Sequence, residues 1–462
     1  MAVLSLLCAL LLCALAFAWF VYVERQGRPL LVIVFLVWLL VVESIFYYSP
    51  NLVLLGLFHP EIGGLSFRLF DLLVPAAVLA RLLSGRELRL HAAALVWLPF
   101  LAWLLGASLL GVLRGNNMQY LTFEAKLGVY LTLIFLAAGI APKAVLESAA
   151  VRRLVIGSSV VALTLTLIHL AGLEIALSIP LLPVERLGRF GSDIASIFVA
   201  MGLVCLAVTL CSERRRGPMM LVLIPLIACG FAVSQRAALL ALTVSIIALA
   251  VLLPLAWQRV RTTITELTVV GAVGLAIVLV PVLVPTVSES RPGALPFAGP
   301  VATAFTSRSK QLSGEDRINQ WDKARRVIAE RPVFGHGLGV TYVYWDPGFF
   351  RFKEAFLTHN IAGDLLIRTG VIGLLLFAAA ALTAIGTGIR SWMLVVDRRI
   401  AALALGCTIA VTGILAKGLV ESIFEKYRLS IFLAVLIGLI IACWRERGPE
   451  RVVAVPMRVP ER

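Results

Sequence analysis

The sequence predicts an all-α, polytopic integral membrane protein. Of its 462 residues, 60% are hydrophobic and only 15% are charged, and the mean hydropathy is +0.98. A soluble protein carries about 25% charged residues. Apolar runs of about 20 residues recur from one end of the chain to the other, and each is long enough to cross a bilayer as a helix.

Hydropathy divides the chain into twelve or thirteen membrane-spanning helices and one long polar segment. We predict a transmembrane bundle over 1–287, a non-cytoplasmic loop over 288–360, C-terminal transmembrane helices over 361–444 and a basic tail over 445–462. The predicted spans are 2–23, 29–48, 65–83, 91–113, 119–141, 153–173, 192–211, 218–234, 236–256, 264–286, 361–389, 399–420 and 428–444.

Lysine and arginine residues gather in connections that all lie on one side of the predicted spans. The positive-inside bias makes that face, including the tail, cytoplasmic. It also accounts for the net charge of +15, which in a soluble domain would suggest nucleic acid. We therefore expect a lipid bilayer as partner and no nucleic acid. Thirteen spans place the N-terminus outside and the C-terminus inside, whereas twelve place both inside. The clusters are Arg25/Arg28, Arg81/Arg86/Arg89, Lys143/Arg152/Arg153, Arg214–Arg216, Arg259/Arg261, Arg390/Arg398/Arg399 and 445–462.

A set of ionisable residues lies within the spans or at their edges, toward the non-cytoplasmic leaflet. Charges at membrane depth are costly and usually face a bundle interior or a wet cavity. The alternative is that single members snorkel or pair locally, as Asp364 and Arg368 could at i, i+4. The set is Glu43, Arg68, Asp71, Glu124, Lys126, Asp364, Arg368, Lys417 and Glu421.

The polar segment 288–360 is too long for a plain connector, which favours a functional role. Its first third is punctuated by proline and glycine and predicts a loop. An amphipathic helix is predicted near 315–331, beginning at Ser313–Asp316 and ending before Pro332. The apolar face of that helix is Ile318, Trp321, Ala324 and Ile328.

Two further stretches follow the predicted helix. Gly335–Gly339 is rich in glycine and predicts a flexible break, and 342–352 is rich in aromatic residues. His336, between two glycines, is either an accessible loop residue or a second ligand for substrate.

Four arginines and one histidine on the non-cytoplasmic side could form a site for phosphate chemistry. Arginine forks match phosphate oxygens bidentately, and a histidine can accept a proton from a hydroxyl. The combination suits a substrate with a diphosphate together with an attacking alcohol. The alternative for each residue alone is a membrane anchor or a helix cap. These residues are Arg186, Arg189, Arg236, Arg317 and His359.

Other cofactor chemistry has no pattern in the sequence. No pair of carboxylates of the Asp-x-Asp kind occurs on the non-cytoplasmic side, so a metal-assisted glycosyl transfer is disfavoured. No glycine-rich phosphate loop with lysine occurs, so ATP is not implied. The seven cysteines lie in or beside apolar runs without metal-type spacing. We expect no cofactor and no bound metal.

His359-Asn360, followed after nine residues by Gly370-Val371-Ile372-Gly373, resembles the His-Asn…Gly-x-x-Gly signature of bacterial O-antigen ligases. Upstream, Arg317, Trp321 and the run 332–337 resemble the Arg, Trp, Pro and Gly-x-Gly run of that family. The turn 234–239, which contains Arg236, is similar to its Ser-Arg turn. The stretch 185–191 is similar to its Arg…Gly-x-Phe entry to a helix, with either Arg186 or Arg189 as the counterpart.

The resemblance implies a C-type-glycosyltransferase-like fold in the bacterial inner membrane, with the long loop and the active site facing the periplasm. The donor would be O-antigen on undecaprenyl diphosphate, and the acceptor a sugar hydroxyl of lipid A-core oligosaccharide. His359 would be the base, the arginines would bind the diphosphate, and Asn360, His336, Gly370 and Gly373 would support them. Transfer would be metal-independent and would invert the anomeric carbon.

Three rivals remain from the sequence. An O-antigen polymerase or a protein O-oligosaccharyltransferase would share the multi-span plan and the chemistry and differ in acceptor. A transporter of lipid-linked sugars would need charges along the full depth of the membrane, whereas the observed charges gather at one face.

Overall fold

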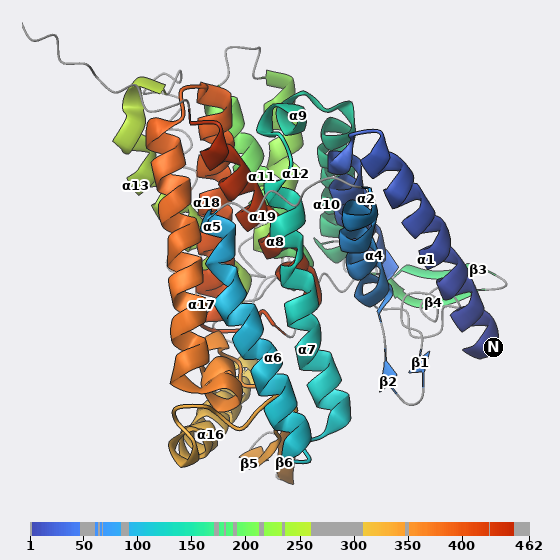
Figure 1. Ribbon diagram of the computed structural model, residues 1–462, viewed down its shortest axis with the longest axis vertical. Coiled ribbons are helices and arrows are strands. Elements are labelled where there is room, and N and C mark those ends of the chain that lie inside the picture. Colours follow the sequence, from blue (N-terminus) through green and yellow to red (C-terminus); the bar gives the residue numbers. More distant parts are fainter. Residues whose placement is uncertain are drawn as a thin grey trace, which may run out of the picture.

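The computed structural model describes residues 2–46, 61–62, 65–66, 68–84, 92–170, 175–179, 182–187, 192–211, 217–232, 236–259, 308–346, 351–424 and 426–447. These residues form a bundle of long, roughly parallel and antiparallel helices (Figure 1). The predicted all-α class is confirmed, and three two-stranded hairpins are its only β-structure in the described ranges.

The bundle is built from apolar helices. The helices are α1 (Ala2–Arg25), α2 (Pro29–Phe46), α4 (Leu69–Leu83), α5 (Ala92–Leu95), α6 (Trp97–Leu113), α7 (Met118–Leu131), α8 (Leu133–Ala138), α9 (Pro142–Glu147), α10 (Ala149–Leu170), α11 (Ser192–Leu210), α12 (Gly217–Ala232), α13 (Arg236–Leu252), η1 (Leu253–Arg259), α17 (Ile361–Leu394), α18 (Arg398–Gly418) and α19 (Tyr427–Arg445).

Within the described ranges, eight helical segments are long and apolar enough to cross a membrane. Every predicted span except 264–286 coincides with a described helix, and 264–286 lies outside the described residues. The protein is therefore a multi-pass membrane protein. The membrane criterion rests on length and apolar composition, which hydropathy measures directly.

Burial separates inner from outer helices. Inside the bundle, 94% of the apolar stretch of α19 is buried, against 28% in the stretch formed by α5 and α6. A helix that is apolar on all sides belongs in an interior or against lipid. We infer that α19 is a central helix and that α6 presents its apolar outer face to lipid.

Ion pairs fix the central helix. The guanidinium of Arg428 in α19 is fully buried, with Nη1 3.0 Å from Asp193 Oδ2 in α11 and Nε 3.4 Å from Glu43 Oε2 in α2. The Tyr427 hydroxyl donates a hydrogen bond to the same Glu43. A buried charge needs such partners because removing it from water is costly. These bonds set the rotation of α19 between α2 and α11.

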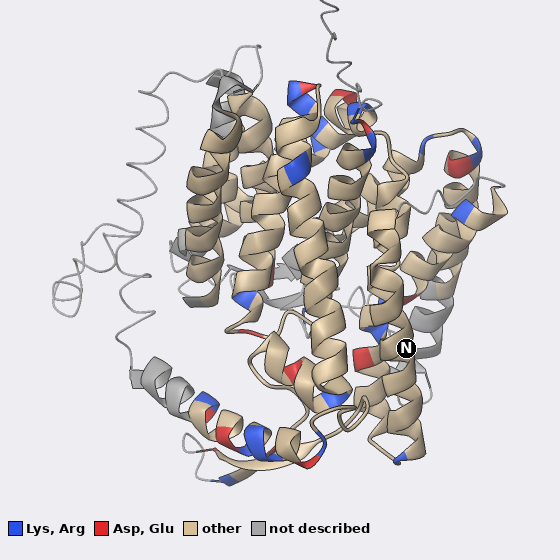
Figure 2. Cartoon of the chain, turned by 60° about the vertical axis from the view of Figure 1, so that its left-hand side comes forward, with Lys and Arg blue, Asp and Glu red and all other residues tan. Residues whose placement is uncertain are grey.

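The two ends of the bundle differ. The α1–α2 connection, α9 and the α17–α18 connection lie at the upper end in Figure 1. At the opposite end α16 (Arg308–Glu330) crosses beneath the bundle with the hairpin of β5 (Tyr342–Asp346) and β6 (Arg351–Ala355). Figure 2 shows charged residues of both signs along α16. We call residues 308–346 and 351–360 the cap.

The cap has its own small core. Strands β5 and β6 are antiparallel, with Tyr342 opposite Ala355 and Tyr344 opposite Lys353. Their inner side chains pack against one face of α16 and one residue of α17. The buried members of this core are Ala324, Val327, Tyr342, Tyr344, Ala355 and Ile367. The alternating burial of β5 follows from the two-residue period of a strand.

The cap departs from the sequence prediction in two respects. Helix α16 begins at Arg308, upstream of the predicted start at Ser313, because 308–312 contains no residue that breaks a helix. Ile318 is 63% exposed, although the period places it on the apolar face. The hairpin covers α16 around Ala324 and Val327 and not at Ile318, so the packed face begins one turn later than predicted, at Trp321.

Two smaller hairpins complete the described elements. One pairs β1 (Glu61–Ile62) with β2 (Leu65–Ser66), and the other pairs β3 (Ile175–Ile179) with β4 (Leu182–Leu187). Both lie beside α1 at the lower right of the bundle in Figure 1.

Candidate active site

The predicted His-Asn pair lies where the cap meets the bundle. Asn360 is the N-cap of α17: its Oδ1 accepts from the backbone N–H groups of Ala362 at 2.8 Å and Gly363 at 3.2 Å. Asparagine is favoured there because its side chain satisfies N–H groups that the first turn leaves free. Asn360 Nδ2 also donates to the carbonyl of Leu419 at 2.9 Å. The residue therefore joins the start of α17 to the α18–α19 turn (419–424).

The same turn holds Arg317. Its Nη1 donates to the carbonyl of Val420 at 3.0 Å, which brings a guanidinium from α16 to the residue that follows Leu419. The imidazole of His359 lies half-buried beside it. Burial first, and the Arg317 charge second, lower the pKa of His359 below its ordinary value, while Asp316, Asp364 and Glu421 act in the opposite direction. At neutral pH His359 is thus an uncharged imidazole, as a proton acceptor must be.

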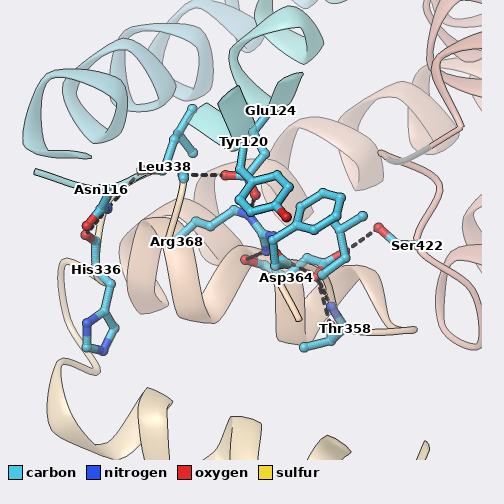
Figure 3. A network of polar contacts seen from close by, with 12 residues as sticks. Asn116, Tyr120, Glu124, His336, Leu338, Thr358, Asp364, Arg368 and Ser422 are labelled. Carbon is cyan, nitrogen blue, oxygen red and sulfur yellow. Dashed lines mark hydrogen bonds and ion pairs between the residues drawn. The ribbon is translucent and has the colours of Figure 1, made fainter. Parts of the chain in front are cut away.

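Asp364, one turn into α17, holds the backbone immediately before His359. Its Oδ1 accepts from the Thr358 backbone N–H at 2.6 Å and from the Thr358 hydroxyl at 2.9 Å, and its Oδ2 accepts from the Ser422 hydroxyl (Figure 3). All three residues are fully buried. Asp364 therefore fixes the approach to His359 against both α17 and the α18–α19 turn.

Arg368 carries the network into α7. Its Nη1 lies 3.1 Å from Asp364 Oδ1, and its Nη2 donates to the carbonyl of Phe356. Its Nε lies 2.6 Å from Glu124 Oε1 in α7, and Glu124 Oε2 accepts from the Gly339 N–H at 2.8 Å (Figure 3). Arg368 thus joins α17 to α7 and to the cap, directly at Phe356 and through Glu124 at Gly339.

Gly370 interrupts α17. Its backbone has φ +65° and ψ −170°, a region that is open essentially only to glycine. An added Cβ would lie 2.1 Å from the carbonyl oxygen of Val333. The N–H groups of Val371 and Ile372 donate to Pro332 and Val333 of the cap, at 2.8 and 3.5 Å, and not to their own helix.

The carbonyls freed by this interruption also find partners in the cap. In an unbroken helix the carbonyls of 367 and 368 would accept from 371 and 372. Here they accept from the backbone N–H groups of His336 at 2.7 Å and Gly337 at 3.0 Å. The carbonyl of Thr369 accepts from the indole N–H of Trp103 at 2.9 Å. The segments that carry the Gly-x-x-Gly and Gly-x-Gly motifs are therefore hydrogen-bonded to each other.

Gly373 and Trp321 pack the same region more tightly. A Cβ on Gly373 would lie 3.0 Å from Trp103 Cδ1 and still closer to Thr369. One on Gly363 would lie 2.5 Å from the Trp321 ring, so Trp321 rests directly on the first turn of α17. The tryptophan, and with it α16, is held over the residues that follow His359.

The prediction of a flexible break at Gly335–Gly339 is wrong. Gly337 has φ +81°, and an added Cβ would lie 2.5 Å from the backbone nitrogen of Gly111 in α6. Leu338 N–H donates to the Ala107 carbonyl at 3.0 Å, and Asn116 Nδ2 donates to the Leu338 carbonyl at 2.8 Å. The glycines serve close packing of backbone against α6 and α7.

His336 belongs to this packing. Its ring Nε2 lies 2.8 Å from the carbonyl of Val327 in α16, and the backbone carbonyl of His336 accepts from Asn116 Nδ2 at 3.1 Å. The ring is half-buried and ties the turn to the cap helix. His336 is therefore a structural residue and not an accessible loop histidine.

The other predicted arginines fall outside what the structure describes in full. Arg186 lies in β4 and Arg236 is the first residue of α13, but their side chains are among the undescribed ones; Arg189 lies outside the described residues altogether. Of the predicted diphosphate-binding set, only Arg317 is thus located next to His359.

Sequence reasoning did not assign Glu124, Asp364 and Arg368 to the site, although all three belong to the predicted set of charges within spans. The i, i+4 pairing of Asp364 with Arg368 is present. The signal that could have singled them out is their depth, because an ionisable group inside an apolar helix has to be paired or functional. Their partners come from distant parts of the sequence, which hydropathy does not connect.

One family model matches the chain. Residues 201–378 match the family described as O-Antigen ligase. The match includes residues 201–210 of α11, all of α12, α13 and the cap, and α17 from its start to residue 378. It therefore contains Arg236, Arg317 and His359 but neither Arg186 nor Arg189. No curated protein matches the chain.

We predict that Gly370→Ala lowers the melting temperature of the detergent-purified protein, because the new methyl group meets the Val333 carbonyl and the backbone is strained. The loss should be about 2–4 kcal/mol in unfolding free energy. The matched control is Gly386→Ala in the same helix, where nothing lies within 4 Å of the added carbon. It should be neutral or slightly stabilising; equal melting temperatures for the two variants would contradict the role of Gly370.

Proposed function

We propose that this chain, whose residues 201–378 match the O-antigen ligase family, joins a lipid-linked glycan to a sugar hydroxyl. The family supports a membrane glycosyltransferase of the ligase or polymerase type. We propose that the donor is O-antigen on undecaprenyl diphosphate and that the acceptor is lipid A-core oligosaccharide. The reaction would take place at the periplasmic face of the inner membrane, where the cap would lie.

The observation that carries the proposal is the position of His359. Its imidazole is kept uncharged by burial and by Arg317, and its backbone is anchored on both sides, by Asp364 through Thr358 and by Asn360 as the helix cap. A base held in this way can accept a proton from a hydroxyl group in one orientation. A guanidinium beside it can bind the oxygens of a departing diphosphate.

The proposed step is a direct displacement. The acceptor oxygen forms a bond to the anomeric carbon of the donor while its proton passes to His359. The bond between that carbon and the diphosphate oxygen breaks, and undecaprenyl diphosphate leaves with the electron pair. Attack from the side opposite to the leaving group inverts the anomeric configuration. Arg317 stabilises the charge that develops on the diphosphate, with Arg236 and Arg186 or Arg189 as further ligands.

The decisive experiment is reconstitution of the full chain in proteoliposomes with a lipid-linked glycan and two acceptors. The acceptors are lipid A-core oligosaccharide and a second lipid-linked glycan unit. Product joined to lipid A-core supports the ligase assignment. Product lengthened on the lipid carrier would identify a polymerase and overturn the proposed acceptor.

We predict that His359→Ala lowers the transfer rate about 100-fold or more because the proton acceptor is lost. The control is His336→Ala, which removes a ring that contacts the Val327 carbonyl and should lower the melting temperature more than the turnover of the folded fraction. Initial rates are measured by gel analysis of glycan product at equal folded protein. Unimpaired transfer by the His359 variant would refute its role as base.

The pH dependence tests the influence of Arg317. Activity requires the uncharged imidazole, and the pKa of His359 is lowered, so kcat/KM should hold constant through neutral pH and fall only at acid pH. Arg317→Gln removes a positive neighbour, raises the pKa of His359 and should move the acid limb to higher pH. Arg317→Lys keeps the charge and should leave the limb in place, while impairing donor use through the lost fork. An acid limb that is the same in all three proteins would contradict this account.

Asp364→Asn tests positioning. The amide keeps an oxygen for Thr358 but loses the ion pair with Arg368, so kcat should fall about tenfold or more with little change in acceptor KM. Loss of the negative charge should also shift the acid limb of kcat/KM to lower pH, opposite to Arg317→Gln, since Asp364 raises the pKa of His359. Asp322→Asn, an exposed carboxylate of α16 paired with Arg325, is the control and should behave as wild type. A KM effect without a kcat effect would argue against positioning.

A further inference from the structure

A polar cavity opens between the N-terminus of α4, α7 and Phe356 of the cap. It measures about 180 Å³ and is lined by Arg68, Gln119, Tyr120, Thr122, Phe123, Lys126 and Phe356. The diphosphate-binding role proposed above uses none of these residues. The lining combines two cations, an amide, two hydroxyl groups and three aromatic rings.

The cavity carries a net positive charge that is available to a ligand. Lys126 Nζ lies 2.7 Å from Asp71 Oδ2, so these two charges offset each other. Arg68 has no carboxylate within ion-pair distance in the described part of the chain. Its guanidinium instead lies over the rings of Tyr427, at 3.8 Å, and Phe123, at 5.1 Å. Stacking holds the guanidinium plane and leaves its N–H edge to bind an oxyanion.

The aromatic side of the cavity is equally ordered. Tyr120 and Phe356 stack with ring centroids 4.2 Å apart and an interplanar angle of 5°, and Phe123 meets Phe356 edge-on. Gln119 and Thr122 add hydrogen-bonding groups at the rim. Apolar ring faces beside polar side chains suit a sugar ring, which has C–H faces and hydroxyl edges. A plain hydrocarbon chain could not form hydrogen bonds with the polar side chains of the lining.

The cavity is connected to the proposed base through a short, fixed stretch of backbone. Phe356 belongs to the cavity, its carbonyl accepts from Arg368, and His359 follows three residues later. Three residues of extended chain span at most about 10 Å. A short oligosaccharide bound in the cavity could therefore place a hydroxyl at His359 while Arg317 faces the base from α16.

We propose that this cavity is a subsite for an anion-bearing saccharide, a sugar ring with a phosphate or carboxylate group, and that it positions the acceptor. Only the role of this subsite in positioning the acceptor rests on the proposed function; the binding of an anionic saccharide does not. Arg68 binds the oxyanion, Tyr120 and Phe356 contact the sugar, and Gln119 borders the entrance.

The binding test uses the full chain in detergent and titration calorimetry with glucose 6-phosphate, glucose and inorganic phosphate. We expect glucose 6-phosphate to bind at least about tenfold more tightly than glucose, as a charge-assisted hydrogen bond implies, and more tightly than phosphate alone. Arg68→Gln should remove that preference. Arg325→Gln, which removes an exposed arginine of α16, should leave it unchanged. Equal binding of glucose and glucose 6-phosphate, or no effect of Arg68→Gln, overturns the subsite.

Gln119→Glu guards against a folding defect in the Arg68 variant. Gln119 is exposed near the start of α7, where an acid is compatible with the helix, so the fold should persist. The added carboxylate should repel the anion and weaken glucose 6-phosphate binding while leaving glucose binding unchanged. Nanodiscs of phosphatidylglycerol and phosphatidylcholine test a lipid headgroup as occupant. If glucose 6-phosphate binds more tightly in phosphatidylcholine than in phosphatidylglycerol, the anionic headgroup competes for the cavity. Failure of the sugar phosphate to displace that lipid would overturn the assignment to a saccharide.

A transfer assay separates this inference from the proposed function. With a phosphorylated acceptor, Arg68→Gln should raise acceptor KM about tenfold and leave donor KM unchanged; with the same acceptor after phosphatase treatment the variant should match wild type. A change in donor KM overturns the acceptor subsite while transfer itself still stands. If the wild type binds glucose 6-phosphate through Arg68 yet transfers nothing, the proposed function fails and the saccharide site remains.

Discussion

The hydrogen bonds exchanged across the break at Gly370 hold the cap to the bundle. A helix cannot be interrupted inside an apolar protein unless the freed backbone groups find other partners. Here the cap supplies them, through Pro332 and Val333 as acceptors and His336 and Gly337 as donors. Because the bonds run in both directions, the break and the cap connection require one another. The position of α16, and hence of Arg317 beside His359, follows from this exchange.

Buried charge supplies the second constraint. Arg368 is a buried cation within this contact, and its burial is tolerated because Glu124 and Asp364 both pair with it. Asp364 also accepts hydrogen bonds from Thr358 and Ser422. Local pairing and a functional role are the two interpretations of Asp364 that the sequence leaves open; the pair with Arg368 is present, and the positioning role is the one proposed above. The ion pair fixes the carboxylate, and the fixed carboxylate orients the backbone at His359.

The sequence predicts the features that depend on local patterns and misses those that depend on distant partners. Hydropathy finds the helices and begins the span 361–389 directly after His359-Asn360. The interruption of that span at Gly370 is not predicted, because the groups that replace its helical hydrogen bonds lie in the cap. The rigidity of Gly335–Gly339 is not visible locally, since its partners are Ala107, Asn116 and Glu124. The exposure of Ile318 likewise depends on where a hairpin more than twenty residues later lies.

The two proposed binding regions share one short stretch of backbone. Residues 356–360 form a narrow strip of backbone between two regions of different origin. On one side lie α16 and the α18–α19 turn, which present Arg317; on the other lie α4 and α7, which present Arg68. Arg368 donates to the Phe356 carbonyl and Asp364 accepts from the Thr358 N–H, so both residues fix this backbone to α17. In the displacement proposed above, nucleophile and leaving group lie on opposite faces of the anomeric carbon, and His359 would take the proton of the nucleophile.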